Sequence, residues 1–261
     1  MPAIIMPAVY QVVGFLGITL EVCLVWRLLS ARLVSTYSCF SLYLLCVLLR
    51  TLTLPAMQWY LIAQGRPEAY ATYYWNAETV GVFLRCLVVW ELFRHTFPAG
   101  SPVRRRVSKA FGTIASVLVI FTLAALWSYA VYGKVRSMNL TLDRSFGFAQ
   151  SVFVLSILLI GRRYGVYLGR NLWGISVGFG AWMSLSTVNY ALFDLTGSFF
   201  PYWQFVRTLS FIGLLVVWLW ALWSPSQSPY IADTPLPDEI LNTWTQNWNR
   251  TFDSVRKVRP Q

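Results

Sequence analysis

Residues 71–109 read ATYYWNAETVGVFLRCLVVWELFRHTFPAGSPVRRRVSK, and this stretch decides the fold class of the chain. Its first part, 71–95, is a mostly apolar run that exceeds the roughly 20 residues a helix needs to cross a membrane. Its last part is a short loop with a cluster of basic residues: Arg104, Arg105, Arg106 and Lys109. An apolar run beside such a cluster is typical of membrane proteins, because their cytoplasmic loops hold an excess of Lys and Arg.

The same pattern repeats along the whole chain. Apolar runs cover seven ranges: 4–28, 37–60, 71–95, 108–132, 146–162, 171–195 and 203–223. Of the 21 Lys and Arg residues, 14 fall at the first, third and fifth gaps or in the tail, and four fall in the other gaps. This alternation predicts an amino terminus outside and a carboxyl terminus in the cytoplasm. We therefore predict an all-α, polytopic bundle of seven transmembrane helices in a cell membrane, either a bacterial inner membrane or a plasma membrane.

Composition narrows the class of partner. The chain is 57% hydrophobic and 12% charged, whereas soluble domains are about 25% charged. A net charge of +11 would favour nucleic acid as the partner of a soluble protein. Here the positive charge lies in short loops beside the runs, where the lipid bilayer and its anionic headgroups are the natural partner. We expect membrane binding and no nucleic-acid binding.

The character of the chain changes after residue 224. Residues 1–224 are the predicted transmembrane domain, and 225–237 are a Pro/Ser-rich linker. Residues 238–261 are predicted to form a cytoplasmic amphipathic helix with a basic end. Its apolar side chains recur at spacings of three and four: Ile240, Leu241, Trp244, Trp248, Phe252 and Val255. Such a helix lies in the membrane interface or docks a membrane or cytoplasmic protein partner, and the sequence leaves both uses open.

Three local features predict how the helices pack. Gly174 and Gly178 form a small-xxx-small pair, which lets two helix backbones approach closely. Pro55 is expected to kink the second helix near its outer end. The apolar part of the fifth run ends at Gly161, and the sequence leaves open whether 164–168 continue as a helix into the cytoplasm.

The candidate functional residues are seven charged residues of the apolar runs that are not counted with the basic gaps: Glu21, Arg50, Glu78, Arg85, Glu91, Asp194 and Arg207. A charge at hydrocarbon depth costs about 2.5–3.5 kcal/mol on insertion scales, so such residues are usually paired or line a polar cavity.

Depth along the helices predicts which of these charges pair. At about 1.5 Å per residue, Arg50 and Glu78 lie at similar depth on consecutive, antiparallel spans. Glu21 on the first span and Arg85 on the third also lie at similar depth. Since Glu78 and Arg85 are seven residues apart, they share one face of the third helix. We predict a polar network that joins the first three helices.

Two further contacts are predicted nearer the helix ends. Glu91 lies close to the cytoplasmic end, where three basic side chains are within its reach: Arg94, His95 and Arg27. Asp194 and Arg207 flank one short outer loop and are expected to pair there.

The charges have two interpretations. A buried ion-pair network would fix helix register, and loss of one partner would then be strongly destabilising. A polar cavity among the first three spans would instead bind a small ligand or carry protons. Four further polar side chains are candidates for its lining: Asn76, Gln150, Thr187 and Asn189.

No motif in the chain names a reaction. His95 is the single histidine, and the four cysteines all lie in apolar runs, so we expect no metal site and no cofactor. We predict a protein without enzymatic activity that acts as a sensor or small-ligand-binding module. A small-solute or proton-coupled transporter is the alternative. A structural subunit of a membrane complex is the third interpretation.

Overall fold

A computed structural model describes residues 2–97, 135–163, 166–196, 200–224 and 230–231, with isolated residues between 104 and 120. Within these ranges it describes the side chains of 11–97, 146–162, 168–189 and 206–224. The predicted fourth run, 108–132, lies largely outside the described residues, and so does the predicted tail helix, 238–261.

Six helices make up most of the described chain: α1 (Pro2–Ser30), α2 (Ser38–Ala63), α3 (Pro67–Thr96), α5 (Val135–Arg163), α6 (Arg170–Thr196) and α7 (Phe200–Trp223). Two strands of two residues each, β1 (Val166–Tyr167) and β2 (Tyr230–Ile231), pair in antiparallel fashion. The described part of the chain is therefore helical, as the sequence predicts.

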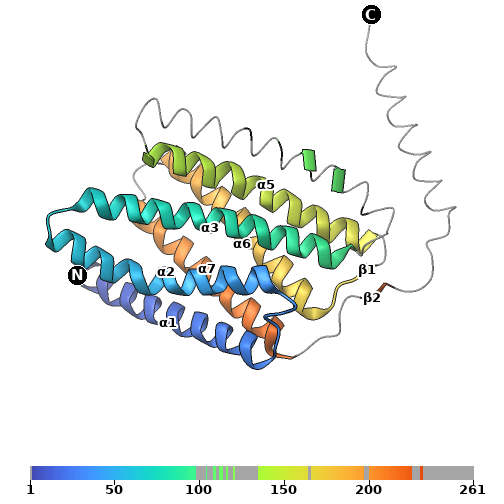
Figure 1. Cartoon of the computed structure of the whole chain (residues 1–261). Coiled ribbons are helices and arrows are strands. Elements are labelled where there is room, and N and C mark those ends of the chain that lie inside the picture. The colour runs from blue at the N-terminus through green and yellow to red at the C-terminus, as the bar shows by residue number, and fades with distance from the viewer. Residues whose placement is uncertain are drawn as a thin grey trace, which may run out of the picture.

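The helices are arranged as a ring. Each described helix packs against the next one in the chain, and α7 returns to pack against α1 (Figure 1). One end of the bundle holds the last turns of α1, α3, α5 and α7 and the first turns of α2 and α6. Basic residues from several helices lie at this end: Arg27, Arg94, Arg162 and Arg170. We call this end of the bundle the basic end and the opposite end the far end.

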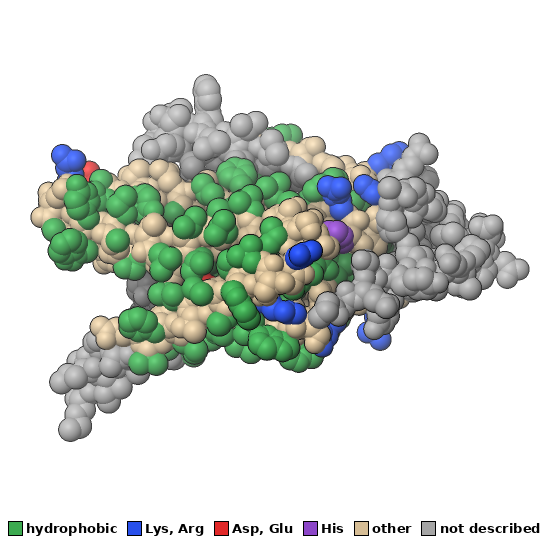
Figure 2. All heavy atoms as spheres, turned by 60° about the horizontal axis from the view of Figure 1, so that its bottom comes forward, with side chains coloured by type: hydrophobic (Ala, Val, Ile, Leu, Met, Phe, Trp, Pro, Cys, Tyr) green, Lys and Arg blue, Asp and Glu red, His purple; other side chains and the backbone are tan. Residues whose placement is uncertain are grey.

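The outer surface of the ring is apolar. Large hydrophobic side chains point outward, among them Phe15 at 72% exposed and Trp59 at 78% exposed. Figure 2 shows hydrophobic side chains along the length of one face and basic side chains gathered beside the histidine. Among the described residues, three segments are long and apolar enough to cross a membrane: Gln11–Ser30, Ser38–Ala63 and Val206–Trp223. These features indicate a membrane location and are compatible with an integral membrane protein.

α6 and α7 approach each other closely at two glycines. A Cβ atom on Gly174 would overlap the Cβ of Ala221, and one on Gly178 would lie 2.5 Å from Nε1 of Trp218. Trp218 is fully buried, and its indole nitrogen donates a hydrogen bond of 3.4 Å to the carbonyl of Ile175. The predicted close approach at this small-xxx-small pair is confirmed.

Side chains from α1 and α6 hold the last turn of α7. Nε of Arg27 donates to the carbonyl of Leu222 at 2.9 Å, and Nε of Arg170 donates to the carbonyl of Ala221 at 3.3 Å. Asn171 lies beside the same carbonyl, and its amide nitrogen donates to it at 2.8 Å when the side-chain amide is oriented to satisfy both of its polar atoms. Because the last carbonyl groups of a helix have no partner within it, these side chains satisfy them, and the cations complement the helix dipole.

α5 begins earlier than predicted and ends within one residue of the predicted 162. The helix begins at Val135, well before the predicted 146, and it stops at Arg163. The open question of a helical continuation is answered by the strand Val166–Tyr167, which pairs with Tyr230–Ile231 from the predicted linker. Gly165 and Gly169 flank this short strand, and glycine is a poor helix former.

Candidate functional site

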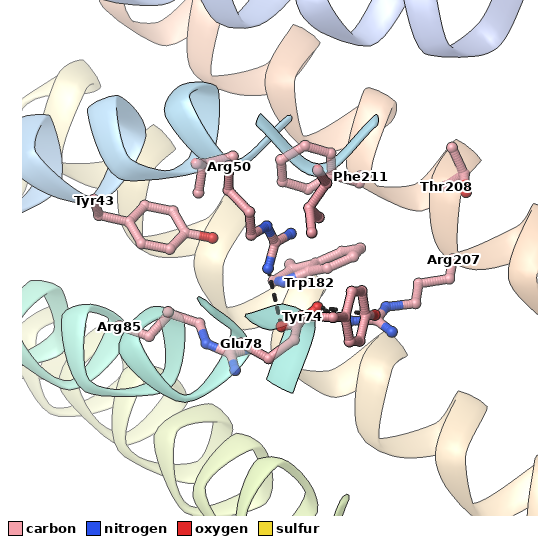
Figure 3. A pocket seen from close by; sticks show the side chains of 12 residues that line it. Tyr43, Arg50, Tyr74, Glu78, Arg85, Trp182, Arg207, Thr208 and Phe211 are labelled. Atoms are coloured by element: carbon pink, nitrogen blue, oxygen red, sulfur yellow. Dashed lines mark hydrogen bonds and ion pairs between the residues drawn. The ribbon is translucent and has the colours of Figure 1, made fainter. Parts of the chain in front are cut away.

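A charged cavity of about 330 Å³ lies inside the ring, between α2, α3, α6 and α7. Four charged side chains line it: Arg50, Glu78, Arg85 and Arg207. Its aromatic lining consists of Tyr43, Tyr74, Trp182 and Phe211, and Figure 3 shows these side chains converging on one space from the four helices. We call it the arginine cavity.

Glu78 on α3 is the centre of the charged lining. Its Oε2 lies 3.0 Å from Nη1 of Arg50 on α2, as depth along the helices predicts. Its Oε1 lies 3.8 Å from Nη2 of Arg207 on α7 and accepts a hydrogen bond of 3.2 Å from the hydroxyl of Tyr74. One carboxylate therefore links three helices across the arginine cavity.

Arg85 reaches toward α6 and does not pair with Glu21. Its Nη1 lies 3.9 Å from the sulfur of Met183, and the residue is 6% exposed. Glu21 is buried on α1 and accepts a hydrogen bond of 3.2 Å from the hydroxyl of Thr51 on α2. The predicted Glu21–Arg85 pair is wrong because α1 has α2 and α7 as its neighbours in the ring. Similar depth does not make two helices adjacent.

Glu91 binds the start of α2, and none of the three basic side chains predicted as its partners is among its contacts there. It is 6% exposed and lies against the start of α2. Its Oε1 accepts from the amide of Cys39 at 3.0 Å and from the hydroxyl of Ser38 at 3.2 Å, and its Oε2 accepts from the amide of Phe40 at 2.9 Å. Glu91 thus caps α2 from another helix, where a negative charge is favourable.

The basic side chains predicted to pair with Glu91 have other surroundings. Arg27 binds the end of α7. Nε2 of His95 lies 2.9 Å from the carbonyl of Thr36, in the turn between α1 and α2. Arg94 is exposed at the basic end. The unpaired amides at the start of a helix also bind a buried carboxylate, and the contacts of Glu91 are of this kind.

For the predicted pair of Asp194 and Arg207, the structure describes the side chain of Arg207 alone. Arg207 lies beside Glu78, whereas the side chain of Asp194 lies outside the described residues. The pair therefore stays a prediction. Arg207 belongs to the arginine cavity in either case, because it is part of the lining.

The four polar residues predicted as lining are placed elsewhere. Asn76 is exposed, and Thr187 donates to the carbonyl of Met183 one turn earlier in α6. Gln150 lies between α5 and α3, where its amide nitrogen is 2.9 Å from the sulfur of Cys86. Neither these three nor Asn189 are among the residues that line the arginine cavity.

An aromatic cluster fills the ring between the arginine cavity and the basic end. Phe40, Phe179 and Trp218 are fully buried, and Tyr43 joins them at the edge of the cavity. The ring centroids of Phe40 and Trp218 are 4.9 Å apart, and those of Phe179 and Trp218 are 5.1 Å apart. Such distances are those of favourable aromatic contacts, so this cluster forms a packed floor.

Several lining residues could have been found from helical spacing. Tyr43 and Leu54 lie seven residues before and four residues after Arg50, and Tyr74 lies four residues before Glu78, so each shares a face with a charged residue. Trp182 carries no such signal, because no charged residue in α6 marks the face that points into the ring.

The electrostatics of the arginine cavity favour an anion. Three guanidinium groups against one carboxylate leave a formal charge of +2 in the described lining. Glu21, close enough to Arg50 to interact with it electrostatically, lowers the sum to +1 when ionised. Guanidinium groups bind carboxylates and phosphates with directional, charge-assisted hydrogen bonds.

Comparisons with protein-family models, with curated proteins and with solved structures found no match for this chain.

Proposed function

We propose that this chain is a seven-helix integral membrane protein of the cell membrane that binds a small anionic ligand in the arginine cavity. In this proposal it is a sensor or binding module without enzymatic activity. The amino terminus is outside and the basic end faces the cytoplasm, where the positive-inside rule places it. One observation carries the binding proposal: the excess of guanidinium groups around a cavity of about 330 Å³ inside the ring.

The course of the chain supports a seventh helix. α3 ends at the basic end and α5 begins at the far end, so one further span is needed between them for both to cross the membrane in the same direction. The apolar run 108–132 falls within this interval, and its 25 residues are enough to cross a bilayer. A seven-span topology satisfies both facts.

The contacts of Glu78 suggest how binding would be sensed. An anion between Arg50 and Arg207 would compete with Glu78 for both guanidinium groups. Because Glu78 links α2, α3 and α7, this competition would change how the three helices pack. The basic end and the predicted tail helix, 238–257, would then report the change to the cytoplasm or to the lipid interface.

Binding can be tested on the purified chain in detergent with three simple anions: inorganic phosphate, acetate and benzoate. At least one should raise the melting temperature measured by far-UV circular dichroism, as ligands of the native state do. Arg207→Gln should weaken that anion by about 10- to 100-fold, since a hydrogen bond to a charged group contributes about 1.5–3 kcal/mol. Arg66→Gln, a change at an exposed arginine outside the cavity, is the matched control. Equal weakening by both variants would refute the proposal.

A transporter remains the second candidate, because Glu78 and Arg207 lie well inside the helices and could exchange partners during a transport cycle. The aromatic floor argues for binding over transport, since translocation would have to open it. In proteoliposomes, a transporter should carry the bound anion, with a rate that depends on a proton gradient. Glu78→Gln should abolish that flux without lowering the amount of folded protein.

A purely structural role for the charges, as in a subunit of a larger complex, has its own test. In that case Arg50→Ala and Glu78→Ala would each prevent folding, and the double variant would fold again. The chain would also co-purify with other proteins in mild detergent and be unstable alone. If the double variant folds and binds the anion as well as the unmodified chain does, the ligand-site proposal fails.

A further inference from the structure

A second cavity of about 330 Å³ lies beside the arginine cavity, between α2 and α3 alone. The two cavities share four lining residues: Tyr43, Val47, Arg50 and Gly81. Away from this junction the lining is mainly apolar and includes Leu49, Val80 and Leu84. We call it the side cavity.

The side cavity opens on the outer surface of the ring. Leu49 on α2 is 52% exposed and Val80 on α3 is 53% exposed, so both lie on the surface that lipid would cover. Away from that surface, Arg50 lines both cavities, so its positive charge lies where the two cavities meet. The lipid-facing side cavity and the positively charged arginine cavity therefore adjoin each other at Arg50.

Gly81 lines both cavities and adds no side chain where they adjoin. The nearest side-chain atom to a Cβ at this position would be Nη1 of Arg50, at 4.0 Å. A larger residue would therefore extend into the passage. The hydroxyl of Tyr73 donates to Oγ1 of Thr53 at 2.9 Å, and this bond joins α3 to α2 within the lining of the side cavity.

We propose that the anionic ligand is a single-chain amphiphile, of which a fatty acid is the simplest example. This inference rests on the proposed function. The head group binds in the arginine cavity, and the hydrocarbon chain leaves through the side cavity between α2 and α3 into the bilayer. A small ion would leave the apolar side cavity unused, and a neutral lipid would not offset the excess positive charge of the arginine cavity. An anionic head on one chain matches both linings.

Cys46 offers a reporter for this test, because it lines the side cavity and is partly exposed. A full-length variant that keeps Cys46 and has alanine at the other three cysteines is reacted with N-ethylmaleimide. Palmitate or lysophosphatidate, added until roughly 90% of the sites are occupied, should slow this reaction about tenfold, because about one tenth of the sites stay free to react. Comparing the two lipids distinguishes a carboxylate head from a phosphate head. A variant that keeps only Cys23, on α1 and outside both cavities, should show no protection.

Two substitutions test the two halves of the ligand separately. Arg207→Gln should remove protection by palmitate because the head group loses a guanidinium partner. Gly81→Leu should remove it by filling the passage. Gly213→Leu, at an exposed glycine of α7 with no side chain nearby, is the matched control and should keep it. If Gly81→Leu does not fold, Val80→Trp narrows the opening instead.

The outcomes separate this inference from the proposed function. If binding of a simple anion depends on Arg207 but neither palmitate nor lysophosphatidate protects Cys46, the proposed function stands and the amphiphile is refuted. If none of the three simple anions and neither of the two lipids binds, both fail. Equal protection by hexadecanol, which has no charge, would refute the role of the anionic head. Protection by two-chain phosphatidate but by neither single-chain lipid would refute the single chain.

Discussion

The contact between Gly174 and Ala221 yields the sharpest stability prediction. In Gly174→Ala the new Cβ would overlap the Cβ of Ala221, although carbon atoms normally stay about 3.5–4.0 Å apart. α7 must therefore move by more than about 1 Å. Overpacking of this kind typically costs about 1–3 kcal/mol. The gain in helix propensity from Gly to Ala, at most about 1 kcal/mol, offsets only part of that loss.

A second substitution makes the cause of this loss testable. Ala221→Gly removes the methyl group that the new Cβ meets, and the Cα of residue 221 would then be its nearest neighbour, at 3.5 Å. The double variant Gly174→Ala/Ala221→Gly only moves one methyl group from α7 to α6, so the two propensity changes cancel. It should unfold within about 1 kcal/mol of the unmodified chain, whereas each single variant is less stable.

The assay is unfolding by sodium dodecyl sulfate in mixed micelles, followed by far-UV circular dichroism. Gly213→Ala, with no atom near its new Cβ, is the control and should be neutral or slightly stabilising. The close-packing argument is refuted if Gly174→Ala is as stable as Gly213→Ala. It is also refuted if the double variant loses the sum of the two single losses.

Two further predictions concern the helix ends. Glu91→Gln leaves one acceptor oxygen where two now bind the start of α2, so the unfolding free energy should fall by about 1–2 kcal/mol. Glu68→Gln, an exposed change in the first turn of α3, should alter it by less than about 0.5 kcal/mol; similar losses in the two variants would contradict the cap. Arg27→Met should increase the hydrogen-exchange rate of the amides in the last turn of α7 about tenfold, because that turn loses a charged partner. Arg94→Met, at an exposed arginine of α3, is the control and should leave this exchange rate unchanged. If Arg27→Met also leaves the rate unchanged, Arg27 does not stabilise the end of α7.

Hydropathy locates helices well where the whole helix is apolar. The run 37–60 nearly coincides with α2, which covers Ser38–Ala63. The run 146–162 covers little more than half of α5, because the helix also includes the polar residues from Val135 onward. Hydropathy reports the part of a helix that hydrocarbon can cover, whereas backbone hydrogen bonds continue through polar side chains. This difference explains why the start of α5 could not be predicted.

The candidate site could also be predicted only in part, because sequence gives the spacing along one helix but not the order of the helices around the ring. Arg50 and Glu78 could be paired from sequence, because consecutive antiparallel helices are usually neighbours and depth then identifies the partner. Glu21 and Arg85 could not be assigned, since depth does not give the order of helices around the ring. The contribution of α6, through Trp182, depends on that order too. Spacing along a helix identifies a face, and only the tertiary arrangement decides what that face meets.

The contact between α1 and α7 has a consequence for biosynthesis. A ribosome makes α1 first, while α7 is the last of the described helices to be made. Until then α1 has only α2 beside it, and Arg27 lacks the carbonyl group that it binds in the complete ring. The wall of the arginine cavity that holds Arg207 is also missing. A nascent chain can therefore form its helices one by one, but the arginine cavity is complete only when α7 packs against α6 and supplies Arg207.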